Sequence, residues 1–342
     1  FFVGATLPRI VVEWFLMSAA TIVLVPLLTQ AASRYGEEEV RHVANTFMTL
    51  SLLFVGVVSV LAFAFAPAIA RAIAPGLGED VHRLSAGILR LLMATSIFSG
   101  VGAMFRGVLH AERKFVLPAA AMNLQGLVSI AFVLALGSAW GVWSVAAGAV
   151  AGTALYAFIL FYPISETHHR FRLELDLEDP VVRRIMALFL PFLIIGIGAQ
   201  INFLSDRWFA SFLSEGAVSI MTYADKIKTP LLGIFAVSVT TPMYTIFSEH
   251  SAAEDLGRLR ETVRQGMRAI SLISLPVVAI FLALREPTIR FLLERGAFLP
   301  GDTATLAHVM LFYGPALVTW SFGILLMHAI FSTQDVYWAV WI

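Results

Sequence analysis

Apolar stretches of about 20 residues recur along the whole sequence, and this repetition constrains the fold more than any other feature. A helix of that length crosses the hydrocarbon core of a bilayer, whereas a strand of a membrane barrel needs only about ten residues and alternates in polarity. Hydrophobic residues make up 59% of the 342 residues and charged residues only 13%, with a mean hydropathy of +0.84. The chain is therefore predicted to be an all-α, polytopic membrane helical bundle.

Nine membrane spans are predicted from these stretches. A short break at residues 137–141 divides one long apolar block into two of them. The predicted spans cover residues 7–28, 43–70, 88–109, 117–137, 142–162, 185–213, 217–247, 266–284 and 303–331.

Basic residues concentrate in alternate connectors, and this asymmetry predicts the orientation of the chain. The connectors on one side carry most of the arginines and lysines, so that side is predicted to face the cytoplasm. These residues are Arg34, Arg41, Arg113, Lys114, Arg170, Arg172, Arg183, Arg184, Arg258, Arg260, Arg264 and Arg268.

The composition shifts from apolar to charged between residues 165 and 184. Asp179-Pro180 within this stretch is typical of a helix N-cap followed by proline at the first helical position. We therefore predict a first lobe at residues 1–163, a cytoplasmic linker at residues 164–182 and a second lobe at residues 183–342.

Two weak internal matches suggest that the lobes are tandem half-repeats. The clearer one aligns Val25-Pro26 with Thr241-Pro242, which places Arg9 opposite Asp225. Transporters build substrate sites at the interface between such repeats, so a central cavity between the two lobes is expected. The alignment also predicts that a span precedes Phe1 and that the second lobe is incomplete.

Charged side chains inside the predicted spans form the candidate substrate site. An ionised side chain at mid-bilayer costs about 2.5–3.5 kcal/mol, so it usually faces a bundle interior or a water-filled cavity. These charges are either structural pairs or the lining of a cationic cavity that suits an anionic substrate, above all a phosphate or pyrophosphate. The candidates are Arg9, Glu13, Asp206, Arg207, Asp225 and Lys226. Lys228 is a further charged residue in the same stretch, and it is not a candidate.

Signatures of enzymes, metal sites and nucleic-acid binding are absent from the sequence. There is no Gly-x-Ser-x-Gly, no phosphate-binding loop and no His-Glu-x-x-His, so the chain is predicted not to be an enzyme and to need no metal or cofactor. The zero net charge gives no sign of a nucleic-acid partner, and the lack of cysteine excludes disulfides. Residues interpreted as structural are the helix-packing glycines Gly100, Gly102 and Gly107, the solvated pair His168-His169, and the core histidines His308 and His328.

Several short motifs, spread nearly end to end along the chain, carry a family resemblance. The most specific are residues 176–184 (DLEDPVVRR) and Tyr223-Ala224-Asp225-Lys226. The others are Phe1-Phe2-Val3, Leu7-Pro8, Val25-Pro26, Arg113-Lys114-Phe115, Pro118, Asn123, Arg295-Gly296-Ala297-Phe298 and Ser332 to Asp335. Together they resemble the MurJ/MviN lipid II flippases of the multidrug/oligosaccharidyl-lipid/polysaccharide exporter superfamily.

This resemblance implies a fourteen-span fold with two six-helix lobes. The chain would hold spans two to six in residues 1–163, and spans seven to ten with the start of eleven in residues 183–342. The implied function is alternating-access export of undecaprenyl-pyrophosphate-linked peptidoglycan precursor, a lipid-linked oligosaccharide, across the bacterial cytoplasmic (inner) membrane. Lys226 stands where the family has a cavity arginine, which implies that it contacts the substrate pyrophosphate. The coupling ion stays open.

The first lobe departs from the family pattern at one place. Where the family's second span carries an Arg-Arg pair, this sequence has Val12-Glu13, with Arg9 one turn earlier on the same face. Two interpretations remain. Either Arg9 replaces the missing charge, or Glu13 neutralises Arg9 through an i, i+4 pair.

Two alternative functions also remain open. A related exporter of polysaccharide-linked lipids or drugs would bind a coupling cation, with Glu13 and Asp206 as candidate ligands. A non-transporting membrane scaffold would instead pair its intramembrane charges in a closed core.

Overall fold

The computed structural model describes residues 1–12, 37–111, 114, 116–166, 174–176, 183, 200–214, 216–253 and 255–333. Across these ranges the chain is helical and contains no strand, which confirms the expected all-α class. Packing divides the chain into two compact units, Phe1–Ser214 and Glu215–Ile342. The predicted linker at residues 164–182 falls largely outside the described ranges, so the predicted lobe boundaries stay predictions.

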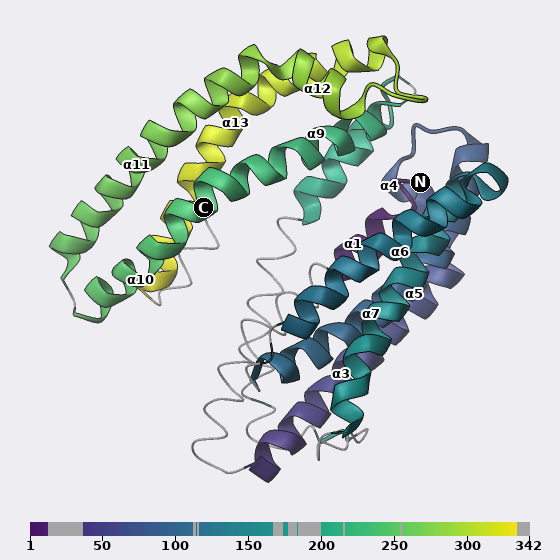
Figure 1. Ribbon diagram of the computed structural model, residues 1–342, viewed down its shortest axis with the longest axis horizontal. Helices are drawn as coiled ribbons and strands as arrows, with labels where there is room; N and C mark the ends of the chain where they lie inside the picture. The colour runs from purple at the N-terminus through teal and green to yellow at the C-terminus, as the bar shows by residue number, and fades with distance from the viewer. Residues whose placement is uncertain are drawn as a thin grey trace. The chain divides into compact units, whose positions relative to one another are not determined.

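The first unit is built from long helices that pack side by side (Figure 1). α5 packs against both α3 and α7, and α6 packs against α7. The helices are α1 (Thr6–Val11), α3 (Glu37–Ala64), α4 (Ala66–Ile73), α5 (Glu79–Ala111), α6 (Val116–Trp140) and α7 (Val142–Glu166), and residues 200–210 are also helical.

Small residues allow α6 and α7 to approach closely. A Cβ atom on Gly152 of α7 would lie 2.5 Å from the carbonyl oxygen of Gln125 on α6. The hydroxyl of Ser129 donates to the carbonyl of Gly148 at 3.1 Å across the same interface. Such contacts replace the hydrophobic driving force that helices lack within a lipid bilayer. The glycine at position 102 has the structural role that we inferred from the sequence, because it packs against the ring of Tyr156.

The predicted continuous span at residues 43–70 is wrong in one respect, because the helix bends by 84° between α3 and α4. Pro67 lies in the first turn of α4 and has no N–H group, so the carbonyl of Phe63 loses its helical donor. Nε of Arg90 on α5 donates to that carbonyl at 3.1 Å instead. The bend is therefore stabilised by a side chain from a neighbouring helix.

The second unit begins with a continuous run of helix, and the next long helix runs back along it in the opposite direction (Figure 1). α9 (Ala217–Leu232), a π-helical turn η3 (Gly233–Val237) and α10 (Ser238–Ala252) follow one another without a break. They are followed by α11 (Leu256–Ala283), α12 (Arg285–Leu293) and α13 (Pro300–Ser332), and α13 packs against α9, α10, α11 and α12. α11 begins ten residues before its predicted span, where Oδ1 of Asp255 accepts a hydrogen bond from the backbone N–H of Arg258 at 2.9 Å.

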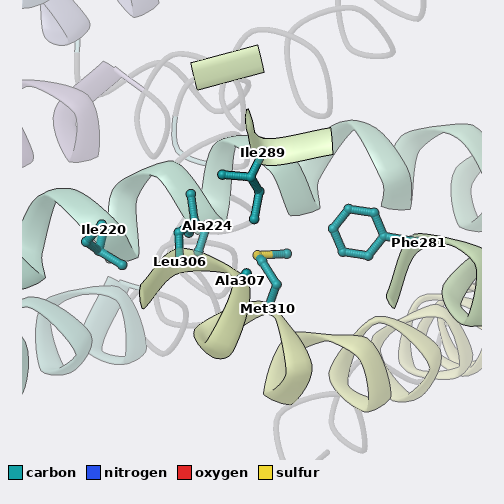
Figure 2. Close-up of a cluster of buried hydrophobic side chains, with 7 residues drawn as sticks. All are labelled: Ile220, Ala224, Phe281, Ile289, Leu306, Ala307 and Met310. Carbon is teal, nitrogen blue, oxygen red and sulfur yellow. The ribbon is translucent and has the colours of Figure 1, made fainter. Parts of the chain in front are cut away.

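Figure 2 shows an apolar cluster that joins four helices of this unit, α9, α11, α12 and α13. It combines Ile220 and Ala224 of α9 with Phe281 of α11, Ile289 of α12, and Leu306, Ala307 and Met310 of α13. Ala224 is fully buried, so the face of α9 on which it lies is fixed against α13. This packing determines in which direction each of the charged residues that follow Ala224 on α9 points.

Five helices in the described residues are long and apolar enough to cross a membrane, namely α5, α6, α7, α11 and α13. The bent pair α3–α4 qualifies as a sixth span if the two helices are counted together. The predicted spans at residues 7–28 and 185–213 lie mostly outside the described ranges, so the total of nine stays a prediction.

The close approach of α6 and α7 predicts that Gly152→Ala destabilises the first unit by about 1–3 kcal/mol, because the added methyl group forces the two backbones apart. Thermal unfolding of the protein in detergent measures the effect. Gly126→Ala on α6 is the matched control, since a Cβ atom there meets no atom within 4 Å. Equal melting temperatures for the two variants would contradict this packing.

Candidate functional site

Two arginines of the first unit converge on one aromatic ring. The guanidinium carbon of Arg207 lies 3.5 Å from the centroid of the Phe203 ring, and that of Arg9 lies 4.6 Å from the same centroid. Arg9 comes from α1 and Arg207 from the helical residues 200–210. The structure therefore brings together two of the predicted site residues that are far apart in sequence.

The two arginines differ in exposure. Arg207 is only 3% exposed, and its Nη1 donates to the carbonyl of Phe203 at 3.5 Å. Arg9 is exposed. A ring face attracts a guanidinium through its quadrupole, so Phe203 holds both cations without neutralising either charge. Of the pair, Arg9 is the group that can meet a ligand.

The segment that carries Arg207 is anchored by a backbone contact. The N–H of Gly76 donates to Oγ of Ser211 at 3.1 Å. A Cβ atom at position 76 would lie 2.3 Å from the carbonyl oxygen of Ser211, so only glycine permits this approach. This contact holds Ser211, one helical turn after Arg207, against the turn that follows α4.

The remaining predicted residues of the first unit are less well defined. Asp206 is partly buried next to Arg207 in the chain. Glu13 lies outside the described residues, so the proposed Arg9–Glu13 pair is not tested. Val12, its neighbour, caps the C-terminus of α1.

In the second unit, α9 carries three charged residues, two on one side of the helix and one on the other. Successive residues of an α-helix are about 100° apart, so Asp225 and Lys228 lie about 60° apart while Lys226 points away from Lys228. Nζ of Lys228 accordingly donates to Oδ1 of Asp225 at 2.6 Å. The side chains of Lys228 and Asp225 are 14% and 17% exposed. The structure thus forms a partly buried ion pair between Asp225 and Lys228.

Lys226 is exposed on the other side of α9. Its Nζ lies 5.9 Å from the centroid of the Tyr223 ring, and Tyr223 packs edge-to-face against Phe298 at 5.6 Å. The assignment of Lys226 as a cation that a ligand can reach is compatible with this exposure and stays a prediction.

Lys228 is the residue whose position the sequence reasoning did not assign. Its Nζ lies 4.1 Å from the ring centroid of Trp320 and 4.8 Å from that of Tyr313, both on α13. The i, i+3 spacing from Asp225 was the available signal, because residues three apart are neighbours on a helix surface. The aromatic partners lie almost a hundred residues downstream and had no such signal.

A third polar cluster joins α3 to residues 174–176 in the first unit. Nδ1 of His42 lies 3.0 Å from Oε2 of Glu174, and Nε2 lies 3.4 Å from Oδ2 of Asp176. The backbone N–H of Glu174 also donates to Oγ1 of Thr49 at 3.1 Å. Partial burial lowers the pKa of His42, but the hydrogen bonds to Glu174 and Asp176 and their charges together raise it above its ordinary value. The imidazolium can donate to both carboxylates at once.

Metal ligation finds little support where the side chains are described. In those ranges no three His, Cys, Asp or Glu side chains gather closely enough to hold an ion. The functional groups that these ranges offer are cations, carboxylates and the faces of aromatic rings.

A chain of long apolar helices that hold charged side chains among them is a multi-pass α-helical membrane protein. The family model described as "Lipid II flippase MurJ" matches residues 1–342, so the chain belongs to this family.

Curated relatives agree with this family. A "Probable lipid II flippase MurJ" of Rhizobium meliloti is 28% identical over 330 residues, which covers 91% of this chain and 59% of the relative. A protein of the same description from Synechocystis sp. is 27% identical over 306 residues, which covers 84% of this chain and 56% of the relative. The chain therefore spans somewhat more than half the length of these relatives.

Solved structures show the same fold. One described as "Lipid II flippase MurJ, inward closed conformation" matches with a TM-score of 0.81 at 20% identity, over 98% of this chain and 69% of the other. A multidrug resistance MATE family transporter of the MOP superfamily, in an inward-facing conformation, also matches with a TM-score of 0.81, at 15% identity and over 98% of this chain and 77% of the other. At these identities the matches establish the fold alone.

The raised pKa of His42 predicts a pH-dependent stability of the α3 contact. A group whose pKa is higher in the folded state stabilises fully below its unfolded-state pKa, about 6.5, and loses that contribution as pH rises through its folded-state pKa. Thermal unfolding at a series of pH values should show that His42→Ala destabilises the protein at pH 6 and much less at pH 9.

The matched background is the double variant Glu174→Gln/Asp176→Asn, which removes both carboxylates but keeps the histidine. In that background His42→Ala should no longer destabilise the protein more at pH 6 than at pH 9. A pH dependence that survives the loss of both carboxylates would contradict the assignment.

Proposed function

We propose that this chain forms part of a flippase that moves lipid II, the undecaprenyl-pyrophosphate-linked peptidoglycan precursor, across the bacterial cytoplasmic membrane by alternating access. The observation that carries the proposal is the match of the flippase family model to residues 1–342. Because the chain covers only part of its relatives, the activity and the substrate are those of the whole protein to which this chain corresponds. A transporter of this kind moves its substrate without chemical change, so the proposal assigns no catalytic residue.

The pyrophosphate group is the part of the substrate that the exposed cations suit. Arginine binds phosphate oxygens through a planar fork of N–H donors, whereas lysine acts as a compact point charge. Among the described residues of the predicted site, Arg9 of the first unit and Lys226 of the second are exposed. Each is a proposed phosphate-binding cation of its own unit, and Arg207 shares the ring of Phe203 with Arg9.

The exposure of Arg9 also bears on the departure from the family's Arg-Arg pair. Its guanidinium lies over the ring of Phe203, and this ring carries no charge that would neutralise it. This supports the interpretation that Arg9 replaces the missing family charge. The competing pair with Glu13 stays open, and the predicted cavity between the lobes stays a prediction.

A second candidate is a related exporter that is coupled to a cation. The shared fold with a MATE family transporter favours it at the level of fold, and the partly buried carboxylate of Asp206 is its candidate ligand in the described residues. Sodium- or proton-dependent efflux without lipid II binding would favour this candidate over the flippase. The scaffold alternative, which requires a closed pairing of all intramembrane charges, stays open.

Binding of lipid II to the purified full-length protein tests the proposal. We expect Arg9→Ala and Lys226→Ala each to weaken binding at least tenfold, since a hydrogen bond to a charged group contributes about 1.5–3 kcal/mol. Lys114→Ala and Arg260→Ala are the matched controls, because both residues are exposed and lie at predicted cytoplasmic connectors. Unchanged affinity and unchanged cell-wall complementation in both test variants would refute the assignment.

A further inference from the structure

The proposed transport of an anionic lipid assigns no role to Lys228 or to the residues around its ammonium group. A carboxylate oxygen of Asp225 lies 2.6 Å from Nζ, and the ring centroids of Trp320 and Tyr313 lie 4.1 and 4.8 Å from it. The two rings are themselves 6.2 Å apart and tilted by 48°, so they form two walls around the ammonium group.

These three groups have the chemistry of a receptor for a monovalent cation. Ring faces attract an ammonium ion through their quadrupole, and a partly desolvated carboxylate adds a full opposite charge. Proteins that recognise free ammonium ligands use such aromatic walls. In this chain the ammonium group is that of Lys228, which lies on α9 together with the carboxylate of Asp225.

The packing of α9 keeps Lys228 in this position. Ala224 is fully buried against α13, which fixes the rotation of α9, and Thr222 is also buried. Lys228 therefore faces the aromatic rings of α13 while Lys226 faces outward. The two lysines, two positions apart in the sequence, have separate environments and separate partners.

We propose that Asp225, Tyr313 and Trp320 form a cation-binding site that Lys228 occupies as a built-in ligand, and that the site accepts a small free alkylammonium ion when the lysine side chain is removed. The site belongs wholly to the second unit and does not depend on which lipid the protein transports. An external cation can enter the native site only by displacing Lys228, which would break the ion pair and both ring contacts between α9 and α13.

Removal and replacement of the ammonium group test this proposal. Lys228→Ala removes three carbons and the amine, which together have the size of n-propylammonium. At pH 8.5 n-propylammonium should bind the variant saturably with a millimolar dissociation constant. The native protein should bind it at least tenfold more weakly. Calorimetry measures the affinity, and the fluorescence of Trp320, checked with Trp320→Phe, reports the location.

Two controls separate cation recognition from filling of an empty space. Propan-1-ol has a similar size but no charge, and it should not bind Lys228→Ala. The double variant Asp225→Asn/Lys228→Ala keeps the aromatic walls but lacks the carboxylate, and it should bind n-propylammonium at least tenfold more weakly than Lys228→Ala. Equal binding to the native protein and Lys228→Ala, equal binding of the alcohol, or full binding by the double variant would each overturn the proposal.

Poor folding of Lys228→Ala would still leave a decisive experiment. A ligand that binds only the folded state multiplies the ratio of folded to unfolded protein by one plus its concentration divided by its dissociation constant. Purification in n-propylammonium should then restore the yield of folded protein, and propan-1-ol should not. Failure of n-propylammonium to restore folding would overturn the proposal. Lipid II binding is measured separately, so either proposal can fail while the other stands.

Discussion

The cost of a charge among apolar helices governs how this chain arranges its functional groups. An ionised side chain at mid-bilayer costs about 2.5–3.5 kcal/mol, and a buried charge without a partner is more costly still. Both units meet this cost with aromatic ring faces, Phe203 for Arg207 and the pair Tyr313 and Trp320 for Lys228. A cation over a ring gains about 2 kcal/mol or more when it is desolvated. The ring contact alone thus offsets much of the cost and does not itself neutralise the charge.

This arrangement divides the cations into buried and exposed members. Arg207 and Lys228 are held within the helices, whereas Arg9 and Lys226 are exposed. The carboxylate of Asp225 pairs with Lys228, the partly buried lysine of the two on α9. A site for a pyrophosphate requires cations that a ligand can reach, and Arg9 and Lys226 are exposed. The proposed pyrophosphate contacts depend on that exposure.

Most of the helical fold could be predicted from the sequence, because long apolar stretches leave a chain few alternatives in a membrane. The bend at Phe65 was missed, since it depends on a proline that removes one donor and on Arg90 from another helix that replaces it. α11 begins earlier than its apolar stretch because a polar cap at Asp255 extends it beyond the membrane segment. Local signals of this kind are in the sequence but are weaker than the hydrophobic pattern.

The site shows where sequence reasoning reaches its limit. The charged residues themselves are conspicuous in apolar surroundings, and Asp225 and Lys226 carry a specific family motif. The residue that pairs with Asp225 is nevertheless Lys228, and the convergence of Arg9 and Arg207 on Phe203 joins distant segments. Which face of α9 meets α13 is decided by the burial of Ala224 in a core assembled from four helices (Figure 2). No local pattern encodes that choice.

The distinction between the two lysines of α9 is the central claim, and their chemical reactivity tests it directly. The chain has three lysines, Lys114, Lys226 and Lys228, and the first two are exposed. The folded protein would be treated with a membrane-permeant amine acylating reagent, and mass spectrometry would give the rate at each lysine relative to the unfolded chain. Burial and the ion pair with Asp225 should slow Lys228 at least tenfold relative to Lys226, with Lys114 reacting at a rate close to that of Lys226. Equal protection of Lys226 and Lys228, or faster reaction at Lys228, would contradict the account.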